Sequence, residues 1–264
     1  MPAPIVMVHG AFCGGWVWDD FRQPFERAGH SVLALDLPGH QAGASRGAVT
    51  GLGMRDYANA VAEACASKGE PPILIGHSMG GLVAQLAAAK MRVRGLILLA
   101  PSAPWGVHGV TVEEAVSAVS LYALGPYWSL AIDPDYASAR LYSFDRAPKD
   151  QRRAIFARMV PESGRALWET LNWWLDPFAS TLVSAQAINA PVLALAGERD
   201  AVHPPATVRQ AAARLSAEVR VMPGMSHWLL GEPGWEDVAA AALDWLEHDG
   251  FCRNRQKADS GSQT

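Results

Sequence analysis

Six short apolar runs recur along this chain of 264 residues, and they constrain its fold more than any other feature. The runs are PIVMVH, SVLALDL, PILIGH, RGLILLAP, PVLALAG and EVRVMPG, and stretches of helical character separate most of them. Continuous apolar runs are typical of strands that are buried on both faces. Strands that alternate with helices form a mostly parallel sheet with helices on both faces, so the sequence predicts an α/β protein.

The alternation of strands and helices stops after the fourth run. About 85 residues of helical pattern follow without a convincing strand. We predict that residues 103–189 form a helical cap, inserted into a core made of residues 1–102 and 190–249. The tail, residues 250–264, is polar and has no periodicity, which predicts disorder.

Large aromatic residues are concentrated in the cap. Residues 104–185 hold nine of the fifteen Trp and Tyr residues of the chain, including Tyr122. Most of them are expected to pack inside the helical layer, because six large apolar residues fall on one face of a predicted helix. These six are Leu167, Trp168, Leu171, Trp174, Leu175 and Phe178. Trp173 lies off this stripe and is freer to face a ligand.

The third apolar run ends in GHSMGG, residues 76–81, and the helix-like sequence LVAQLAAAK follows. A one-residue reversal from strand to helix strains the backbone of the central residue, and its neighbours must lack bulk. The spacing G-x-S-x-G is that of the nucleophile elbow, which lifts the serine hydroxyl above the sheet. Ser78 is therefore a candidate nucleophile. The simpler interpretation is a Gly-rich turn with a capping serine, so the decision depends on its partners.

A serine nucleophile needs a base to take its proton and a carboxylate to orient that base. Asp200 follows the fifth apolar run and His227 follows the sixth, so both are expected at the carboxyl edge of the sheet. Either residue alone could instead cap the next helix, but the order Ser, Asp, His is typical of this triad. Glu198 competes as the acid, yet it stands nearer the strand and is expected to point elsewhere. The other position for an acid, after RGLILLAP, holds Ser102.

The tetrahedral intermediate of acyl transfer needs two hydrogen-bond donors for its oxyanion. One is expected to be the backbone N–H of Met79, at the start of the helix after the elbow. The other is expected from the Gly-rich loop VHGAFCGGW, where we favour Ala11 and keep Phe12 as the alternative. We expect His9 to support this loop through hydrogen bonds. His40 and His203 are interpreted as loop residues.

Composition excludes several classes of partner. The formal net charge is -4 and only 18% of residues are charged, so no basic surface for nucleic acid or an anionic membrane is indicated. No apolar run approaches the roughly 18 residues of a membrane span. The three cysteines are scattered, and no spacing typical of a metal site occurs. Together with an N-terminus that lacks a basic flank, this predicts a cytoplasmic protein without a metal or a cofactor.

The motifs VHGAF, DLPGH, GHSMGG, GERD and MSHW occur in this order over about residues 4–247, and as a set they resemble the α/β-hydrolase superfamily. The resemblance implies the α/β-hydrolase fold, a mostly parallel sheet with helices on both faces and an inserted helical cap. The N-terminal sequence is similar to the branch of plant methylesterases and hydroxynitrile lyases. In that branch the lyases use a threonine and a lysine at the positions of Gly10 and Trp228, so hydrolysis is favoured here. A serine nucleophile also excludes the relatives that attack with aspartate.

The sequence thus predicts a serine hydrolase that cleaves a small carboxylic ester or lactone through an acyl-enzyme on Ser78. Residues proposed to contact the substrate are Phe12, Trp105, Trp128, Trp173 and Trp228. A C–C bond hydrolase or a cofactor-free dioxygenase on the same scaffold is an alternative, and a ligand receptor with a retained triad is another. The sequence specifies neither the acyl and alcohol groups nor the oligomeric state.

Overall fold

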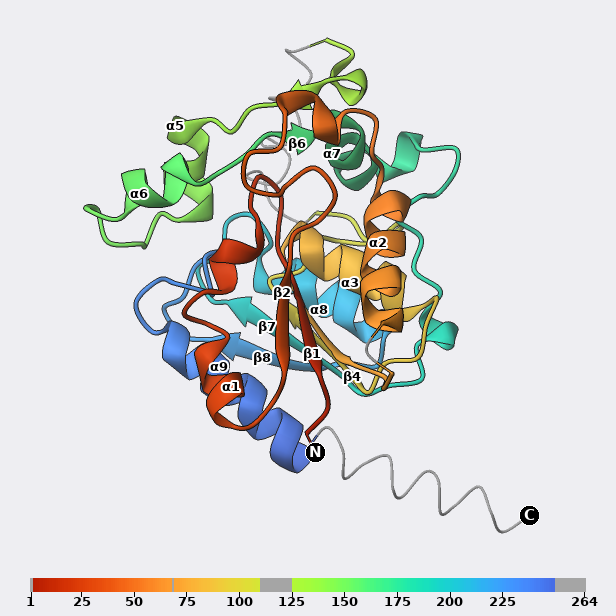
Figure 1. The fold of residues 1–264 in the computed structure, drawn as a ribbon, viewed down its shortest axis with the longest axis vertical. Coiled ribbons are helices and arrows are strands. Elements are labelled where there is room, and N and C mark those ends of the chain that lie inside the picture. The colour runs from red at the N-terminus through yellow and green to blue at the C-terminus, as the bar shows by residue number, and fades with distance from the viewer. Residues whose placement is uncertain (1, 68, 110–124, 250–264) are drawn as a thin grey trace.

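A computed structural model describes residues 2–67, 69–109 and 125–249. Within these ranges six strands form one parallel sheet in the order β2-β1-β3-β4-β7-β8 (Figure 1). They are β1 (Ile5–Val8), β2 (Val32–Leu35), β3 (Ile73–His77), β4 (Gly95–Leu99), β7 (Val192–Gly197) and β8 (Glu218–Met222). Each predicted apolar run contains one of them. The predicted α/β-hydrolase fold, with its mostly parallel sheet, is confirmed.

Helices cover both faces of this sheet. On one face lie α2 (Met54–Ala66), α3 (Met79–Ala88) and α8 (Pro205–Arg214), and on the other α1 (Gln23–Arg27) and α9 (Trp235–Asp244). Successive side chains of a strand point to opposite faces. In β1, Val6 and Val8 therefore join the core under α2, α3 and α8, whereas Ile5 and Met7 join the core under α1 and α9. The central strands β1, β3, β4 and β7 are buried along their whole length, which is why their sequences are almost entirely apolar. The edge strands β2 and β8 are partly exposed, and β8 carries Glu218 and Arg220.

The segment predicted to form the cap, residues 103–189 and called the cap below, contains α5 (Tyr136–Ser138), α6 (Arg152–Ala157) and α7 (Gly164–Leu171). It also contains two short antiparallel strands, β5 (Ala131–Ile132) and β6 (Glu162–Ser163). The expectation that this segment lacks strands was therefore wrong, because strands of two residues leave no periodicity to detect. Tyr122 and the tail of residues 250–264 lie outside the described residues.

The predicted helical stripe from Leu167 to Phe178 was also wrong in its second half. Helix α7 ends at Leu171, and Asn172 leaves the helical conformation with φ −123° and ψ 35°. A single 3-10 turn, η5 (Trp173–Leu175), follows the helix. Beyond this break the apolar residues no longer share one face, and Trp174, Leu175 and Phe178 are exposed.

Short helical turns complete the described chain. They are the 3-10 turns η1 (Gly15–Trp18), η2 (Arg46–Val49), η3 (Tyr127–Ser129) and η6 (Ala185–Ala187), and the π-helical turns η4 (Ala139–Ser143) and η7 (Trp245–Asp249). In Figure 1 the cap elements β6 and α7 lie beyond the carboxyl ends of the strands. Within the described ranges, no helix has both the length and the apolar character needed to cross a membrane.

Candidate active site

Ser78 alone makes the turn between β3 and α3, because the strand ends at His77 and the helix begins at Met79. Its backbone has φ 54° and ψ −125°, a strained conformation for a residue with a side chain. A Cβ atom on Gly76 would lie 2.4 Å from Gly80 O, and one on Gly80 would lie 2.2 Å from His9 O. Only glycine fits at these two positions, so the close contact of backbone segments holds Ser78 in this conformation.

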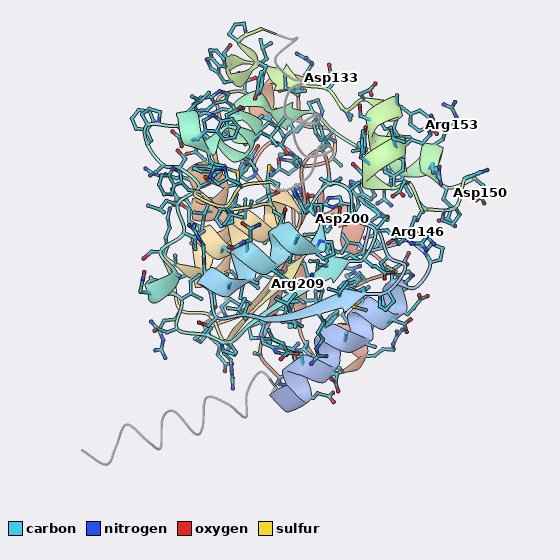
Figure 2. The ribbon with its side chains drawn as sticks, turned by 180° about the vertical axis from the view of Figure 1, so that it is seen from behind. Asp133, Arg146, Asp150, Arg153, Asp200 and Arg209 are labelled. Carbon is cyan, nitrogen blue, oxygen red and sulfur yellow. The ribbon has the colours of Figure 1, made fainter. Side chains whose placement is uncertain are left out.

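Three side chains from three strand ends form a continuous hydrogen-bonded chain. His227 Nε2 lies 3.0 Å from Ser78 Oγ, and His227 Nδ1 lies 2.9 Å from Asp200 Oδ2. Because a carboxylate only accepts, Nδ1 carries the proton and Nε2 is left to accept from the serine hydroxyl. The structure thus brings together the three residues that the sequence nominated, and Asp200 lies in the interior of the molecule (Figure 2).

The carboxylate of Asp200 is held at both oxygens. Its Oδ1 accepts hydrogen bonds from the N–H groups of Val202 and His203, each at 2.8 Å. Burial raises the pKa of Asp200, but the charge and hydrogen bond of His227, with a smaller contribution from His203, outweigh it and hold the pKa below its ordinary value. The competing acid, Glu198, accepts instead from Gly224 N at 2.8 Å. Asp200 is therefore the acid that contacts the histidine.

Two further histidines pack around His227, and their contacts were not predicted. His77 Nε2 donates to the carbonyl oxygen of His227 at 2.9 Å, and burial followed by the charge of His227 lowers the pKa of His77 to about 3. The ring of His203 lies 5.3 Å from the ring of His227, and its Nε2 is 2.9 Å from Ser102 Oγ. His203 is thus more than a loop residue: it joins the ends of β4 and β7 beside the triad.

The loop after β1 passes directly beside Ser78. A Cβ atom on Gly10 would lie 3.0 Å from Ser78 Cβ. Among the residues that the structure describes, neither the N–H of Ala11 nor that of Met79 donates to a protein acceptor. The N–H of Phe12 donates to Glu162 Oε2 at 3.3 Å, which favours Ala11 over Phe12 as a free donor.

His9 supports the loop after β1 through hydrogen bonds to backbone groups. Leu37 N donates to His9 Nε2 at 3.0 Å, so this nitrogen accepts and the proton sits on Nδ1, which donates to Gly10 O at 2.8 Å. Burial, reinforced by the charge of His40, lowers the pKa of His9 to about 3. The ring is neutral and fully committed to backbone groups, in the supporting role expected of it.

The five residues proposed to contact the substrate do not all lie together in the structure. Trp173 is only 8% exposed and packs edge-on against Trp105, at 5.4 Å between ring centroids. Trp128 instead lines an apolar groove of about 680 Å³ on the cap, together with Trp168. Trp228 is buried in the core, 6.0 Å from the ring of His77. Phe12 packs against a small apolar cluster of the cap that contains Tyr127, Ile132 and Leu167.

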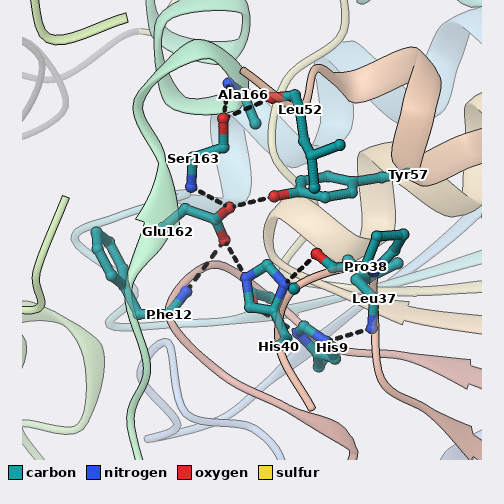
Figure 3. A network of polar contacts seen from close by, with 12 residues as sticks. His9, Phe12, Leu37, Pro38, His40, Leu52, Tyr57, Glu162, Ser163 and Ala166 are labelled. Carbon is teal, nitrogen blue, oxygen red and sulfur yellow. Dashed lines mark hydrogen bonds and ion pairs between the residues drawn. The ribbon is translucent and has the colours of Figure 1, made fainter. Parts of the chain in front are cut away.

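A buried polar network between the cap and the core was missed altogether. His40 and Glu162 form a hydrogen-bonded pair at 3.0 Å, with both side chains inaccessible to solvent (Figure 3). His40 lies in the loop after β2, as the sequence indicates, but its buried pairing was not predicted. Because these partners are 122 positions apart, no local pattern could have paired them. Within the described ranges, no cluster of three metal-ligating side chains occurs.

Comparisons with known proteins give the family. A family model described as the alpha/beta hydrolase family matches residues 5–241. Methylesterase 7 from Arabidopsis thaliana is 36% identical over 211 residues, which cover 71% of this chain and 79% of the relative. Pimeloyl-(acyl-carrier protein) methyl ester esterase from Stenotrophomonas maltophilia is 32% identical over 217 residues, 79% of either chain. Other curated plant relatives match over only 41% or 43% of their own length.

Solved structures agree with this assignment. A crystal structure of a methylesterase from Arabidopsis superimposes with a TM-score of 0.72, covering 93% of this chain and 99% of the other. At 18% sequence identity this likeness shows a shared fold. The family model matches nearly the whole chain, and a methylesterase is 36% identical to it. These two findings show common family membership, which a shared fold alone would not. The chain belongs to the alpha/beta hydrolase family, in its methylesterase-like branch.

Proposed function

We propose that this protein is a serine hydrolase that cleaves a small carboxylic ester or lactone through an acyl-enzyme on Ser78. The observation that carries the proposal is the chain of contacts from Asp200 through His227 to Ser78, with links of 2.9 and 3.0 Å. The broader statement, that the protein is a carboxylic ester hydrolase, follows from relatives that are named methylesterases and methyl ester esterases.

The reaction follows from the roles that the geometry allows. Ser78 Oγ attacks the ester carbonyl carbon while His227 Nε2 takes the hydroxyl proton, and Asp200 stabilises the resulting imidazolium. The oxyanion accepts hydrogen bonds from the N–H groups of Ala11 and Met79, the second at the positive end of α3. His227 then returns the proton to the departing alcohol. A water molecule, activated by the same histidine, releases the acid.

Two positions argue against lyase chemistry. The threonine of hydroxynitrile lyases would stand at Gly10, where even a Cβ atom would lie 3.0 Å from Ser78 Cβ and 3.3 Å from His77 O. The lysine of those enzymes would stand at Trp228, a buried residue of the core. The site therefore has no cation at that position to stabilise a leaving cyanide.

The substrate is proposed to be an ester of a small alcohol. Relatives named for methyl esters support this choice. A lactone contains the same bond closed into a ring, so the same steps would open it. Methyl, ethyl and aryl esters of graded acid size, together with lactones, form the panel that would identify the acyl and alcohol groups.

The experiment that tests the mechanism combines substitution with active-site labelling. Ser78→Ala is expected to abolish hydrolysis of every ester in the panel while leaving the fold intact, since only a hydroxyl is lost. A fluorophosphonate probe should label the parent protein at Ser78, and mass spectrometry of the digested protein locates the adduct. Ser102→Ala is the matched control, because this serine also follows a strand but lies against His203, and labelling should survive.

Other outcomes would point to the alternatives. Labelling at another residue, or activity that survives Ser78→Ala, would contradict the nucleophile. Turnover of a ketone-like substrate without ester hydrolysis would indicate a C–C bond hydrolase or a dioxygenase. Tight binding of a small ligand without turnover would indicate a receptor.

A further inference from the structure

The loop that carries Ala11 contains a residue in a left-handed conformation. Phe12 has φ 63°, which few residues other than glycine adopt. Such a conformation is strained and persists only when its surroundings enforce it. Here the enforcement comes from the cap. Phe12 O accepts from Val160 N at 2.9 Å, and Phe12 N donates to the side chain of Glu162 at 3.3 Å.

The carboxylate of Glu162 is completely satisfied by donors (Figure 3). Its Oε1 accepts from Tyr57 Oη and from Ser163 N, each at 2.7 Å, and its Oε2 accepts from His40 Nε2 and Phe12 N. A carboxylate offers about four lone-pair positions, and two of these donors are backbone N–H groups that can only donate. Burial raises the pKa of Glu162, but the charge and hydrogen bond of His40, together with the hydrogen bonds of Tyr57 and Ser163, outweigh it and hold the pKa below its ordinary value. Glu162 is therefore ionised although it is fully buried.

His40 supplies the matching positive charge. Its Nε2 faces Glu162 Oε2, and its Nδ1 faces the carbonyl oxygen of Pro38 at 3.1 Å. Both ring nitrogens therefore donate, which makes the ring an imidazolium. Burial lowers the pKa of His40, but the charge of Glu162 and its hydrogen bond outweigh this and raise the pKa above its ordinary value. Glu162, in the cap, is thus an anion in contact with Phe12 N, and His40, in the core, neutralises its charge.

We infer that Glu162 is a positioning residue for the oxyanion hole: through the ion pair with His40 it fixes Phe12, and so sets the direction of the neighbouring Ala11 N–H. A residue of the cap then contributes to the geometry of the reaction centre. Oxyanion donors work only when they are held in place before the reaction, and an error of about 1 Å can cost about 100-fold in rate. This inference rests on the proposed function, since it assigns a support to a donor named there.

The test compares Glu162→Gln with Tyr57→Phe. The glutamine keeps the shape of the side chain but loses the charge, and it has one acceptor oxygen for four donors. Tyr57→Phe removes one hydrogen bond from Oε1 and leaves Oε2 with Phe12 and His40, so it is the matched control. Rates are divided by the concentration of sites that a fluorophosphonate titrates, which removes unfolded protein from the comparison.

We expect Glu162→Gln to lower kcat by about 10-fold to 100-fold with little change in KM. A trifluoromethyl ketone analogue of the substrate, which adds Ser78 Oγ to its carbonyl and places an oxyanion in the same hole, should lose affinity by a similar factor. An ether analogue, which forms no oxyanion, should bind as it does to the parent. Tyr57→Phe should lower thermal stability and leave kcat within about twofold.

Equal affinity of the parent and Glu162→Gln for the ketone, with unchanged kcat per titrated site, would overturn the inference. So would a parallel loss for both variants. If Glu162→Gln does not fold, His40→Gln takes its place with the same measurements, because it removes the cation that shares Oε2 with Phe12. Failure of the proposed function is distinguishable: the parent itself would then neither hydrolyse esters nor react at Ser78.

Discussion

At the scale of single residues, the orientation of Asp200 decides what the triad can do. One oxygen meets His227 and the other accepts from two backbone N–H groups, so the side chain cannot rotate without losing several hydrogen bonds. The carboxylate therefore selects the imidazole tautomer with its proton on Nδ1. Glu198 stands only two positions away but accepts from Gly224 N.

This arrangement predicts unequal effects for two similar substitutions. Asp200→Asn keeps the geometry but favours the wrong tautomer of His227, and we expect turnover to fall by up to about 10,000-fold. Glu198→Gln should cost far less, because Glu198 contacts a loop and not His227, and the glutamine keeps a carbonyl oxygen that can accept from Gly224 N. Steady-state kinetics with one methyl ester measure both effects. A larger loss for Glu198→Gln would show that the acid is wrongly assigned.

Local sequence was sufficient to place Ser78, Asp200 and His227 at one edge of the sheet, but not to predict the contacts that hold the loop beside them. Ser78, Asp200 and His227 each follow an apolar run, so the parallel arrangement of strands brings them to one edge. The position of a strand end does not predict the pairing of Glu162 with His40. That pairing depends on how the cap folds back onto the core, and a single sequence contains no periodic or spacing signal for that contact.

At the scale of elements, the end of α7 separates packed from exposed aromatic residues. Asn172 breaks the helix, and its side chain donates to Tyr127 Oη at 2.7 Å. After the break, Trp173 turns inward against Trp105 and the ring of His108, while its neighbour Trp174 is 55% exposed. The helical spacing of apolar residues continues past Asn172 in the sequence. The spacing therefore could not predict that the helix ends there.

The two adjacent tryptophans predict a contrast. Trp173→Ala should lower the free energy of unfolding by about 3 kcal/mol or more, because a large buried side chain is lost. It should leave the ranking of ester substrates unchanged. Trp174→Ala should change stability by about 0.5 kcal/mol or less, as expected of an exposed site. Urea denaturation gives the stabilities, and kcat/KM for aryl and acetate esters gives the ranking.

A selective effect on activity would reverse this assignment. If Trp173→Ala weakened turnover of bulky aryl esters by about 10-fold while sparing small esters, Trp173 would line the substrate pocket, since about 1.4 kcal/mol of lost contact corresponds to tenfold in rate.

At the scale of the whole molecule, the fold buries uncharged histidines in two places. His9 and His77 are 0% and 2% exposed, and burial is the main reason why the pKa of each is lowered to about 3. At a pH below the ordinary histidine pKa of about 6.5, both residues bind a proton in the unfolded chain. In the folded protein they stay neutral until the pH approaches 3. Their burial therefore makes folding depend on pH.

Stability is expected to fall as the pH decreases from about 6.5 towards 4. In that range unfolding takes up nearly two protons at His9 and His77, and most of a third at His203, whose pKa burial lowers to about 4. Three protons would correspond to at most about 4.1 kcal/mol per pH unit. Asp200 and Glu162, whose pKa values are lowered, add to the loss at still lower pH. His40, whose pKa is raised, acts oppositely, and its contribution is lost as the pH rises above about 6.5. Urea midpoints measured from pH 4 to 8 check the slope, and a flat profile between pH 5 and 6.5 would contradict it.

The two backbone groups of Phe12 that meet Val160 and Glu162 have a consequence for protein engineering. Exchanging caps between relatives is an obvious way to change which esters an enzyme of this family accepts. In this protein, residues 160–162 belong to the cap but form hydrogen bonds to the loop after β1. A transplanted cap must therefore bring both the main-chain donor and the acidic side chain, or the recipient must carry a glycine in place of Phe12 so that the loop holds its shape unaided.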